Sequence, residues 1–140
     1  MIYEATREIE APAARAWGML SAVETWPQWL PTVTGVEPLD GSPIAVGRRY
    51  RVTQPKIRPS LWRVTEIAPG RRFVWRAQSP GLEMIAEHEV EPVGGNARVR
   101  LGYEFRGLLG AVLGRMFGGI TREYLEREAQ TLKARVEESR

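Results

Sequence analysis

The only histidine of this chain lies in residues 82–91, a run that alternates like a strand with one wet face and one buried face. His88 shares its side with Leu82, Met84, Ala86 and Val90. Four glutamates take the other side, and they are Glu83, Glu87, Glu89 and Glu91. An inward imidazole with an ordinary pKa near 6.5 could shuttle a proton or anchor a ligand by a hydrogen bond. It could equally be a structural group, neutral and bonded to a backbone carbonyl or to Tyr103.

Three further polar residues are candidates for chemistry beside His88. Tyr103, Glu66 and Gln54 each share strand parity with apolar neighbours, so we expect them to face inward. Tyr103 and Glu66 could supply a second acid or base. Gln54 and Tyr103 could orient an apolar ligand through hydrogen bonds.

Several kinds of chemistry lack the residues that they need. The chain has no cysteine, which excludes disulfides and thiol chemistry. One histidine and solvent-facing glutamates make a poor metal site. The glycines near residues 107–119 lack the strand–loop–helix setting of a phosphate-binding loop, and no serine–histidine pairing suggests a nucleophilic triad. We therefore expect no metal and no cofactor.

Large side chains on the inward faces predict the walls of a core or of a cavity. Aromatic residues pack cores well. Their number here, opposite a glycine-rich helix, favours a lined cavity, and methionine adapts to ligands of varied shape. The residues of this predicted lining are Tyr50, Gln54, Trp62, Trp75, Met84, His88, Tyr103, Met116 and Ile120.

The elements that position these residues begin with a strand from Ile2 to Glu10. Two short helices should follow, over Ala13 to Val23 after Pro12 and over Glu24 to Leu30. Turns rich in glycine and proline then separate six short runs, which predict an antiparallel meander. The runs are Thr32–Leu39, Gly47–Gln54, Leu61–Ile67, Arg72–Gln78, Glu83–Glu91 and Ala97–Phe105.

The last third of the chain predicts one long helix, from about Leu108 to Glu138, because its apolar residues recur at helical spacing. Its first half contains Gly110, Gly114, Gly118 and Gly119. A glycine inside a helix costs roughly 1 kcal/mol relative to alanine. Four of them predict a bend, fraying or close approach to a bulky neighbour.

The formal charge of +3 invites a nucleic-acid interpretation, but the arginines are spread along the chain. In a sequential meander, the four glutamates lie opposite arginines of the two neighbouring strands. Opposite charges across strands stabilise a sheet by about 0.2–1 kcal/mol a pair and cancel the field that would attract phosphate. We therefore expect no nucleic-acid partner. A weaker basic patch between Arg48 and Arg58 is either solvated or meets a membrane surface or an acidic ligand.

The length of 140 residues predicts a single domain over residues 1–140. No run of about 18 apolar residues is present, so we expect no stable membrane insertion. The first residues lack the pattern of an export signal, which makes the cytoplasm the expected location. The sequence leaves the oligomeric state open.

The order of motifs resembles the START-like, or SRPBCC, superfamily of polyketide cyclase/dehydrase and lipid-transport proteins. The resemblance is carried by Glu8 to Pro12, Trp26 to Pro31, Trp62-x-Val64-x-Glu66, His88 and Gly94 to Val99, and it covers essentially the whole chain. It implies an α+β helix-grip fold, in which a seven-stranded curved antiparallel sheet wraps round the C-terminal helix. It also implies a cavity between sheet and helix, with Trp26 and Trp29 either at its mouth or plugging the open end of the sheet.

Three functions remain open at this point. The chain could bind a hydrophobic small molecule, such as a lipid or a polyketide, in that cavity. It could instead be a cyclase or dehydratase of the polyketide type, with His88 as its acid or base. It could also be an interaction module, in which Trp26, Trp29 and the basic patch contact a protein or a membrane.

Overall fold

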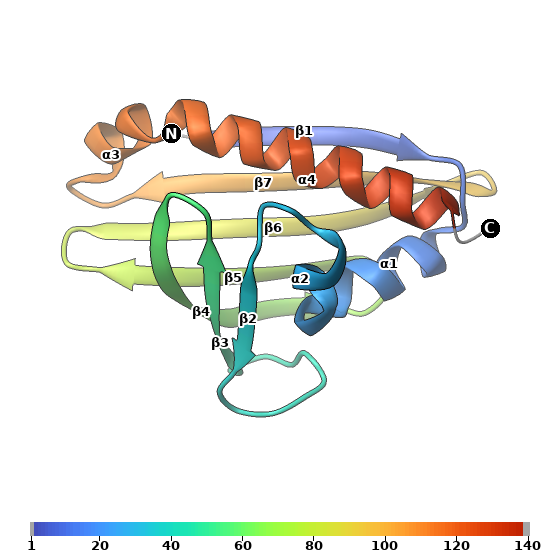
Figure 1. Ribbon diagram of the computed structural model, residues 1–140, viewed down its shortest axis with the longest axis horizontal. Coiled ribbons are helices and arrows are strands. Elements are labelled where there is room, and N and C mark those ends of the chain that lie inside the picture. Colours follow the sequence, from blue (N-terminus) through green and yellow to red (C-terminus); the bar gives the residue numbers. More distant parts are fainter. Residues whose placement is uncertain (1, 139–140) are drawn as a thin grey trace.

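A seven-stranded sheet curves around a long helix and forms the body of the protein (Figure 1). The computed structural model describes residues 2–138. Neighbouring strands all run antiparallel, in the order β1-β7-β6-β5-β4-β3-β2. The strands are β1 (Ile2–Ile9), β2 (Gly35–Pro38), β3 (Arg49–Gln54), β4 (Ile57–Ala68), β5 (Arg72–Ser79), β6 (Leu82–Val93) and β7 (Asn96–Arg106).

Helices occupy the two ends of the chain. The first group follows β1 and comprises α1 (Ala13–Ser21), the 3-10 turn η1 (Val23–Thr25) and α2 (Trp26–Trp29). The second group follows β7 and comprises α3 (Gly110–Met116) and α4 (Gly118–Glu138). Helix α4 packs over β1 and β7 and touches α1 at its far end. This confirms the helix-grip fold expected from the sequence. Within residues 2–138, no helix has the length and apolarity needed to cross a membrane.

The predicted C-terminal helix is divided in two at Phe117, as its glycines indicated. The hydroxyl of Tyr3 donates a hydrogen bond to the carbonyl of Gly114 at 2.8 Å, and a Cβ on Gly118 would collide with that hydroxyl. A Cβ on Gly110 would lie 3.0 Å from the carbonyl oxygen of Phe105. The glycines therefore let α3 and the start of α4 lie directly on β1 and β7.

A bulge in β4 corrects one prediction about the sheet faces. Val64 pairs with Trp75 and Glu66 pairs with Val74, so Thr65 is an extra residue in the ladder. An extra residue reverses the side on which the next side chains emerge. Glu66 therefore points outward, 3.6 Å from Arg72, and is not the inward acid that simple alternation indicates.

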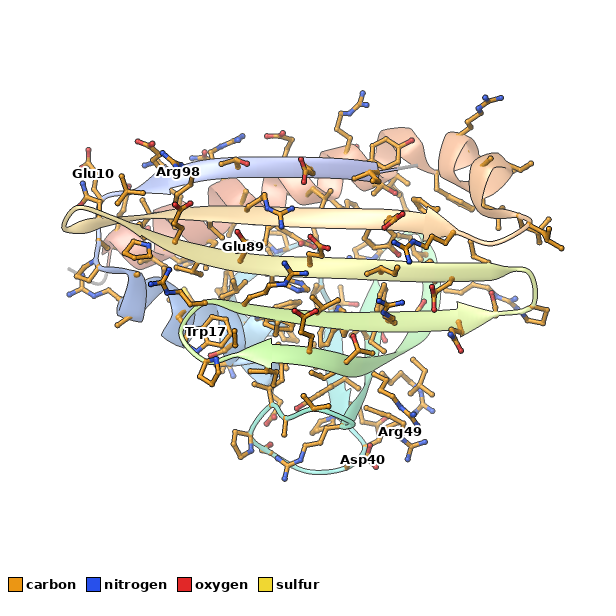
Figure 2. The ribbon with its side chains drawn as sticks, turned by 180° about the vertical axis from the view of Figure 1, so that it is seen from behind. Glu10, Trp17, Asp40, Arg49, Glu89 and Arg98 are labelled. Atoms are coloured by element: carbon orange, nitrogen blue, oxygen red, sulfur yellow. The ribbon has the colours of Figure 1, made fainter. Side chains whose placement is uncertain are left out.

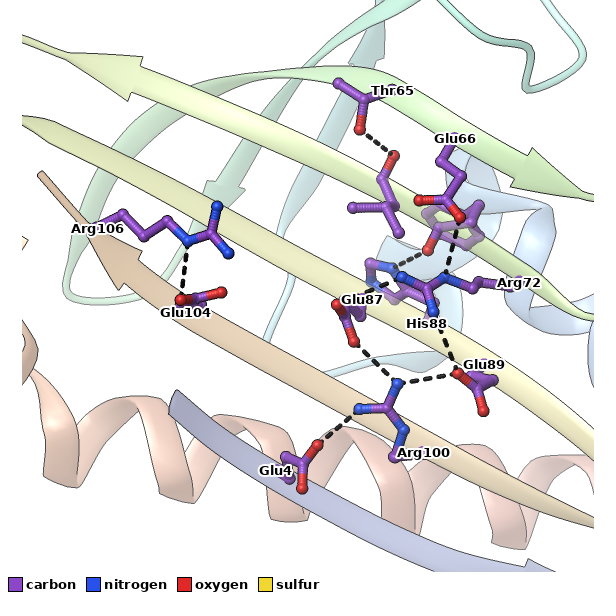
Figure 3. A network of polar contacts seen from close by, with 12 residues as sticks. Glu4, Thr65, Glu66, Arg72, Glu87, His88, Glu89, Arg100, Glu104 and Arg106 are labelled. Atoms are coloured by element: carbon purple, nitrogen blue, oxygen red, sulfur yellow. Dashed lines mark hydrogen bonds and ion pairs between the residues drawn. The ribbon is translucent and has the colours of Figure 1, made fainter. Parts of the chain in front are cut away.

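Arginine and glutamate side chains cover the outer face of the sheet (Figure 2). Arg100 reaches Glu4 at 2.7 Å, Glu87 at 2.8 Å and Glu89 at 2.9 Å, and Arg72 contacts the last two from the other side (Figure 3). The predicted ladder of opposite charges is present. It joins β1, β7, β6 and β5 across their solvent side.

Candidate functional site

Two chambers that share walls lie between the sheet and the C-terminal helices. The inner chamber has a volume of about 70 Å³, and the outer chamber has a volume of about 480 Å³. The outer chamber lies between the β3–β4 hairpin, the ends of β5 and β6, and α3. Five residues border both chambers and thus mark their junction, and they are Gln54, Ile57, Trp62, Tyr103 and Thr121.

His88 borders the inner chamber from β6. Its side chain stacks on the ring of Phe73, with ring centroids 4.0 Å apart and planes 8° apart. Its Nδ1 lies 3.3 Å from the carbonyl oxygen of Phe73. A carbonyl can only accept, so Nδ1 carries the proton and Nε2 is left as an acceptor. Burial lowers the pKa of His88 to about 3, against the raising effect of that hydrogen bond. At neutral pH it is a neutral imidazole.

Glu128 borders the same chamber from α4 and was not among the residues predicted from the sequence. Burial raises the pKa of this carboxyl to about 7, although the hydroxyl of Thr32 donates a hydrogen bond to its Oε1 at 3.1 Å. Glu128 follows Tyr124 by four residues and precedes Leu132 by four, both of which are buried. That spacing places all three on one face of a helix, and it is the signal that could have revealed the residue.

Two tyrosines extend the polar lining between Glu128 and the outer chamber. The hydroxyl of Tyr103 donates to the sulfur of Met84 at 3.1 Å. Burial and the nearby charge of Glu128 raise the pKa of Tyr103. The hydroxyl of Tyr124 donates to the carbonyl of Pro55, which ties α4 to the β3–β4 hairpin. Both phenols are therefore protonated at neutral pH.

Aromatic rings form the apolar wall of the inner chamber. Trp75 lies at its centre, with ring centroids 5.4 Å from Trp26 and 5.9 Å from Trp62. The indole nitrogen of Trp26 donates to the carbonyl of Leu20 at 3.0 Å, which fixes α2 against α1. These rings are held by neighbours on several elements. The chamber is therefore preformed, with little need to collapse around a ligand.

The structure places most of the predicted lining residues at the chambers. The residues at the inner or outer chamber are Trp26, Gln54, Trp62, Trp75, Met84, His88 and Tyr103. Trp29 borders a void of about 10 Å³ at the closed end, next to α2, and a shallow groove outside. Trp26 is buried beside the same void, which favours a plug over a mouth at that end.

Tyr50, Met116 and Ile120 border neither chamber. Tyr50 is fully buried in the core beside Trp75, and its hydroxyl has no hydrogen-bond partner within residues 2–138. Met116 is 68% exposed to solvent. The placement of Met116 in the cavity was wrong because glycines occupy the face of α3 that touches the sheet, which turns the larger side chains away. Ile120 lies near the start of α4 and is half-buried there.

Leu113 and Phe117 replace Met116 and Ile120 as the helical wall of the outer chamber. The strands β5, β6 and β7 add apolar side chains to the same chamber, and these are Ala77, Leu82, Met84 and Phe105. The site as a whole therefore combines a large, mostly apolar outer chamber with a small inner chamber. At the inner end, a carboxyl that titrates near neutrality and a neutral imidazole offer a donor and an acceptor.

A sequence profile for the family described as polyketide cyclase/dehydrase and lipid transport matches residues 2–137. The chain belongs to this family. Among curated proteins, none matches the chain. The family profile spans every element described above, from β1 to α4, and so includes the whole of the two chambers.

Solved structures of the same fold include two described as aromatase/cyclases. The Zhui aromatase/cyclase from Streptomyces sp. R1128 is 16% identical, with a TM-score of 0.79 over 98% of this chain and 93% of its own. The di-domain protein BexL, from the BE-7585A biosynthetic pathway, is 21% identical, with a TM-score of 0.72. The match spans 94% of this chain and 46% of the BexL chain.

A hypothetical protein from Helicobacter pylori gives a TM-score of 0.82 at 13% identity, over 97% of this chain and 88% of its own. Identities at this level show a shared helix-grip fold. Within one fold, function depends on the residues of the site.

Proposed function

We propose that this family member, acting as a single domain, binds a hydrophobic small molecule in the two chambers. The observation that carries the proposal is the preformed, mostly apolar space whose outer part alone is about 480 Å³. Pockets for small ligands typically measure about 300–1,000 Å³, with a few polar groups that fix orientation. A lipid or a polyketide has the required apolar body.

The polar groups at the inner end favour a ligand with an oxygen function at its leading end. Protonated Glu128 can donate a hydrogen bond to a ligand carbonyl, and Nε2 of His88 can accept one from a ligand hydroxyl. Hydrophobic burial would supply most of the affinity, at about 25 cal/mol per Å² of apolar surface. The inner polar groups would select the orientation.

Binding of the neutral fluorophore N-phenyl-1-naphthylamine tests this function. We expect saturable binding of one molecule per chain, with increased emission. Ala77 lines the outer chamber, so Ala77→Phe should fill it and weaken binding at least tenfold. Ala14→Phe adds the same ring on the exposed side of α1 and should leave binding unchanged. If the parent protein fails to bind, or both variants bind equally well, the proposal fails.

A second function, cyclisation or dehydration of a poly-carbonyl substrate, is favoured by Glu128. A general acid–base group works best when its pKa lies near the working pH. Glu128 satisfies that condition, whereas His88 is too weak a base and remains neutral. As a carboxylate, Glu128 could remove a proton from a carbon between two carbonyls. As an acid, it could protonate a departing hydroxyl, which leaves as water.

The two functions separate in a Glu128→Gln variant. Catalysis requires the proton, so turnover of a poly-β-carbonyl substrate should fall at least a hundredfold. Fluorophore affinity at pH 6, where the native carboxyl is mostly protonated, should stay within threefold. Unchanged turnover would rule out Glu128 as the acid–base group.

A further inference from the structure

Helix α3 carries an apolar surface that no part of the described chain covers. Leu108 just before it is 94% exposed, Val112 is 57% exposed and Met116 is 68% exposed. Leu109 and Phe117 are partly exposed beside them. We call these five residues the α3 patch. Scattered apolar residues are normal on a surface, but a cluster on one short helix and the residues that flank it marks an interaction site.

Three cations lie on α3 or at the outer chamber that α3 borders. Arg115 lies on α3 itself, and Lys56 and Arg58 lie on the β3–β4 hairpin at the opposite wall of the outer chamber. None of the three forms an ion pair with another residue of the described range 2–138. Residues 54–61 and 106–122 contain no aspartate or glutamate. The carboxylates that flank the second segment, Glu104 and Glu123, are paired with Arg106 at 2.8 Å and with Arg127 at 3.3 Å.

We propose that the α3 patch and these three cations form a docking surface for a membrane that contains anionic lipid. Apolar side chains on one helix can enter the boundary between headgroups and acyl chains, while lysine and arginine contact the anionic headgroups. The combination of unpaired cations with exposed leucine, valine and methionine fits that interface. An acidic protein would satisfy the cations but would leave the apolar side chains less well matched.

A second copy of this chain fits the surface poorly. A symmetric dimer through α3 would bring each patch against itself, together with the unpaired cations of both copies. Like charges across an interface oppose association. The two segments offer no carboxylate that could compensate for them. The charge pattern therefore favours a negatively charged partner over self-association.

Docking of α3 would also place the outer chamber against the lipid. Leu113 and Phe117 line the chamber, although Phe117 is also partly exposed, whereas Val112 and Met116 are largely exposed to solvent. We infer that these side chains give a mostly apolar path from the surface into the cavity. An apolar ligand could move along it between bilayer and protein without crossing water. This last step rests on the proposed function, but membrane docking itself does not.

Flotation with lipid vesicles tests the proposal. The probes are vesicles of phosphatidylcholine alone and vesicles with 30% phosphatidylglycerol. We expect binding to the anionic vesicles, falling with added salt. The triple variant Lys56→Gln/Arg58→Gln/Arg115→Gln should lose roughly 100-fold in partition coefficient, because each cation near such a surface contributes about fivefold. The matched control replaces three exposed arginines elsewhere, Arg15, Arg63 and Arg71, with glutamine, and should bind almost as the parent does.

The apolar half of the proposal needs its own variants. Val112→Ser/Met116→Ser should weaken binding at least tenfold, whereas Val46→Ser, at an exposed position in the β2–β3 loop, should not. Tryptophan introduced as Met116→Trp should be quenched by brominated lipids, and Val46→Trp should not be. Unlike the triple charge variant, these changes leave the net charge intact, so they test insertion separately.

Three results would overturn the proposal. The first is a failure of the parent protein to bind anionic vesicles. The second is an equal loss of binding in the α3 variants and their matched controls. The third is concentration-dependent dimerisation by light scattering that Val112→Ser/Met116→Ser abolishes, without any vesicle binding, because that would identify a second copy as the occupant.

Discussion

Replacing Glu128 by glutamine should stabilise the protein at alkaline pH. In the folded chain the carboxyl has a pKa of about 7, against 4.5 for the exposed group. As the pH rises from 4.5 to 7, the unfolded chain releases this proton before the folded chain does. The free energy of unfolding therefore falls across that window and stays low above it. Glutamine cannot ionise, and its carbonyl can still accept the hydrogen bond from Thr32.

The size of the effect follows from the two pKa values. A change from 4.5 to about 7 corresponds to about 3 kcal/mol between the protonated and ionised states. The side chain is only partly buried, so water will relieve some of this cost when it ionises. At pH 8.5, we expect the free energy of unfolding of Glu128→Gln to exceed that of the parent by about 1–3 kcal/mol. At pH 4.5 the two proteins should differ little.

Urea unfolding at half-unit intervals from pH 4.5 to 8.5, followed by tryptophan fluorescence, measures this difference. Glu123→Gln is the matched control, since Glu123 lies on the exposed side of α4, and it should follow the parent curve. The reasoning is refuted if the parent and Glu128→Gln show the same pH dependence. A difference that is constant with pH would also refute it, because it would reflect packing and not ionisation.

Three other measurements test separate parts of the structure. The NMR signals of His88 should not titrate between pH 8 and 5, and a midpoint near 6.5 would contradict its lowered pKa. Gly118→Ala should cost about 1–3 kcal/mol through its clash with Tyr3, whereas Gly119→Ala, which meets open space, should not destabilise; equal costs would exclude the clash. Arg100→Met should cost about 1–2 kcal/mol in low salt and less in 1 M salt; no loss would show that the ladder contributes nothing.

The fold was predictable because polar and apolar residues alternate along the strands, and this pattern can be read from short stretches of sequence. Residues 82–91 alternate so regularly that they placed His88 inside and four glutamates outside, opposite the arginines that they contact in the structure. The bulge at Thr65 interrupts such an alternation without any mark in the sequence. Glu66 was therefore assigned to the wrong face. Period alone cannot show where a strand gains an unpaired residue.

The candidate site was only partly predictable, for two physical reasons. A glutamate on a helix is ordinarily exposed, and so Glu128 was not singled out despite its spacing from Leu132. In α3, glycines and not large residues make the close contact with the sheet. The usual assumption that apolar side chains point inward consequently fails in α3. Met116 was therefore predicted to line the cavity, whereas it lies on the surface.

The break at Phe117 separates two sets of constraints on sequence change. Helix α4 carries Glu128 and must keep its fit against β1 and β7, whereas the outward side chains of α3 are largely exposed and less restricted by neighbours. Substitutions on that side can accumulate without disturbing the carboxyl, and changes around the carboxyl need not alter the rim. Descendants of this sequence can therefore change the partner that α3 contacts without changing the ligand that the chambers bind, and the reverse.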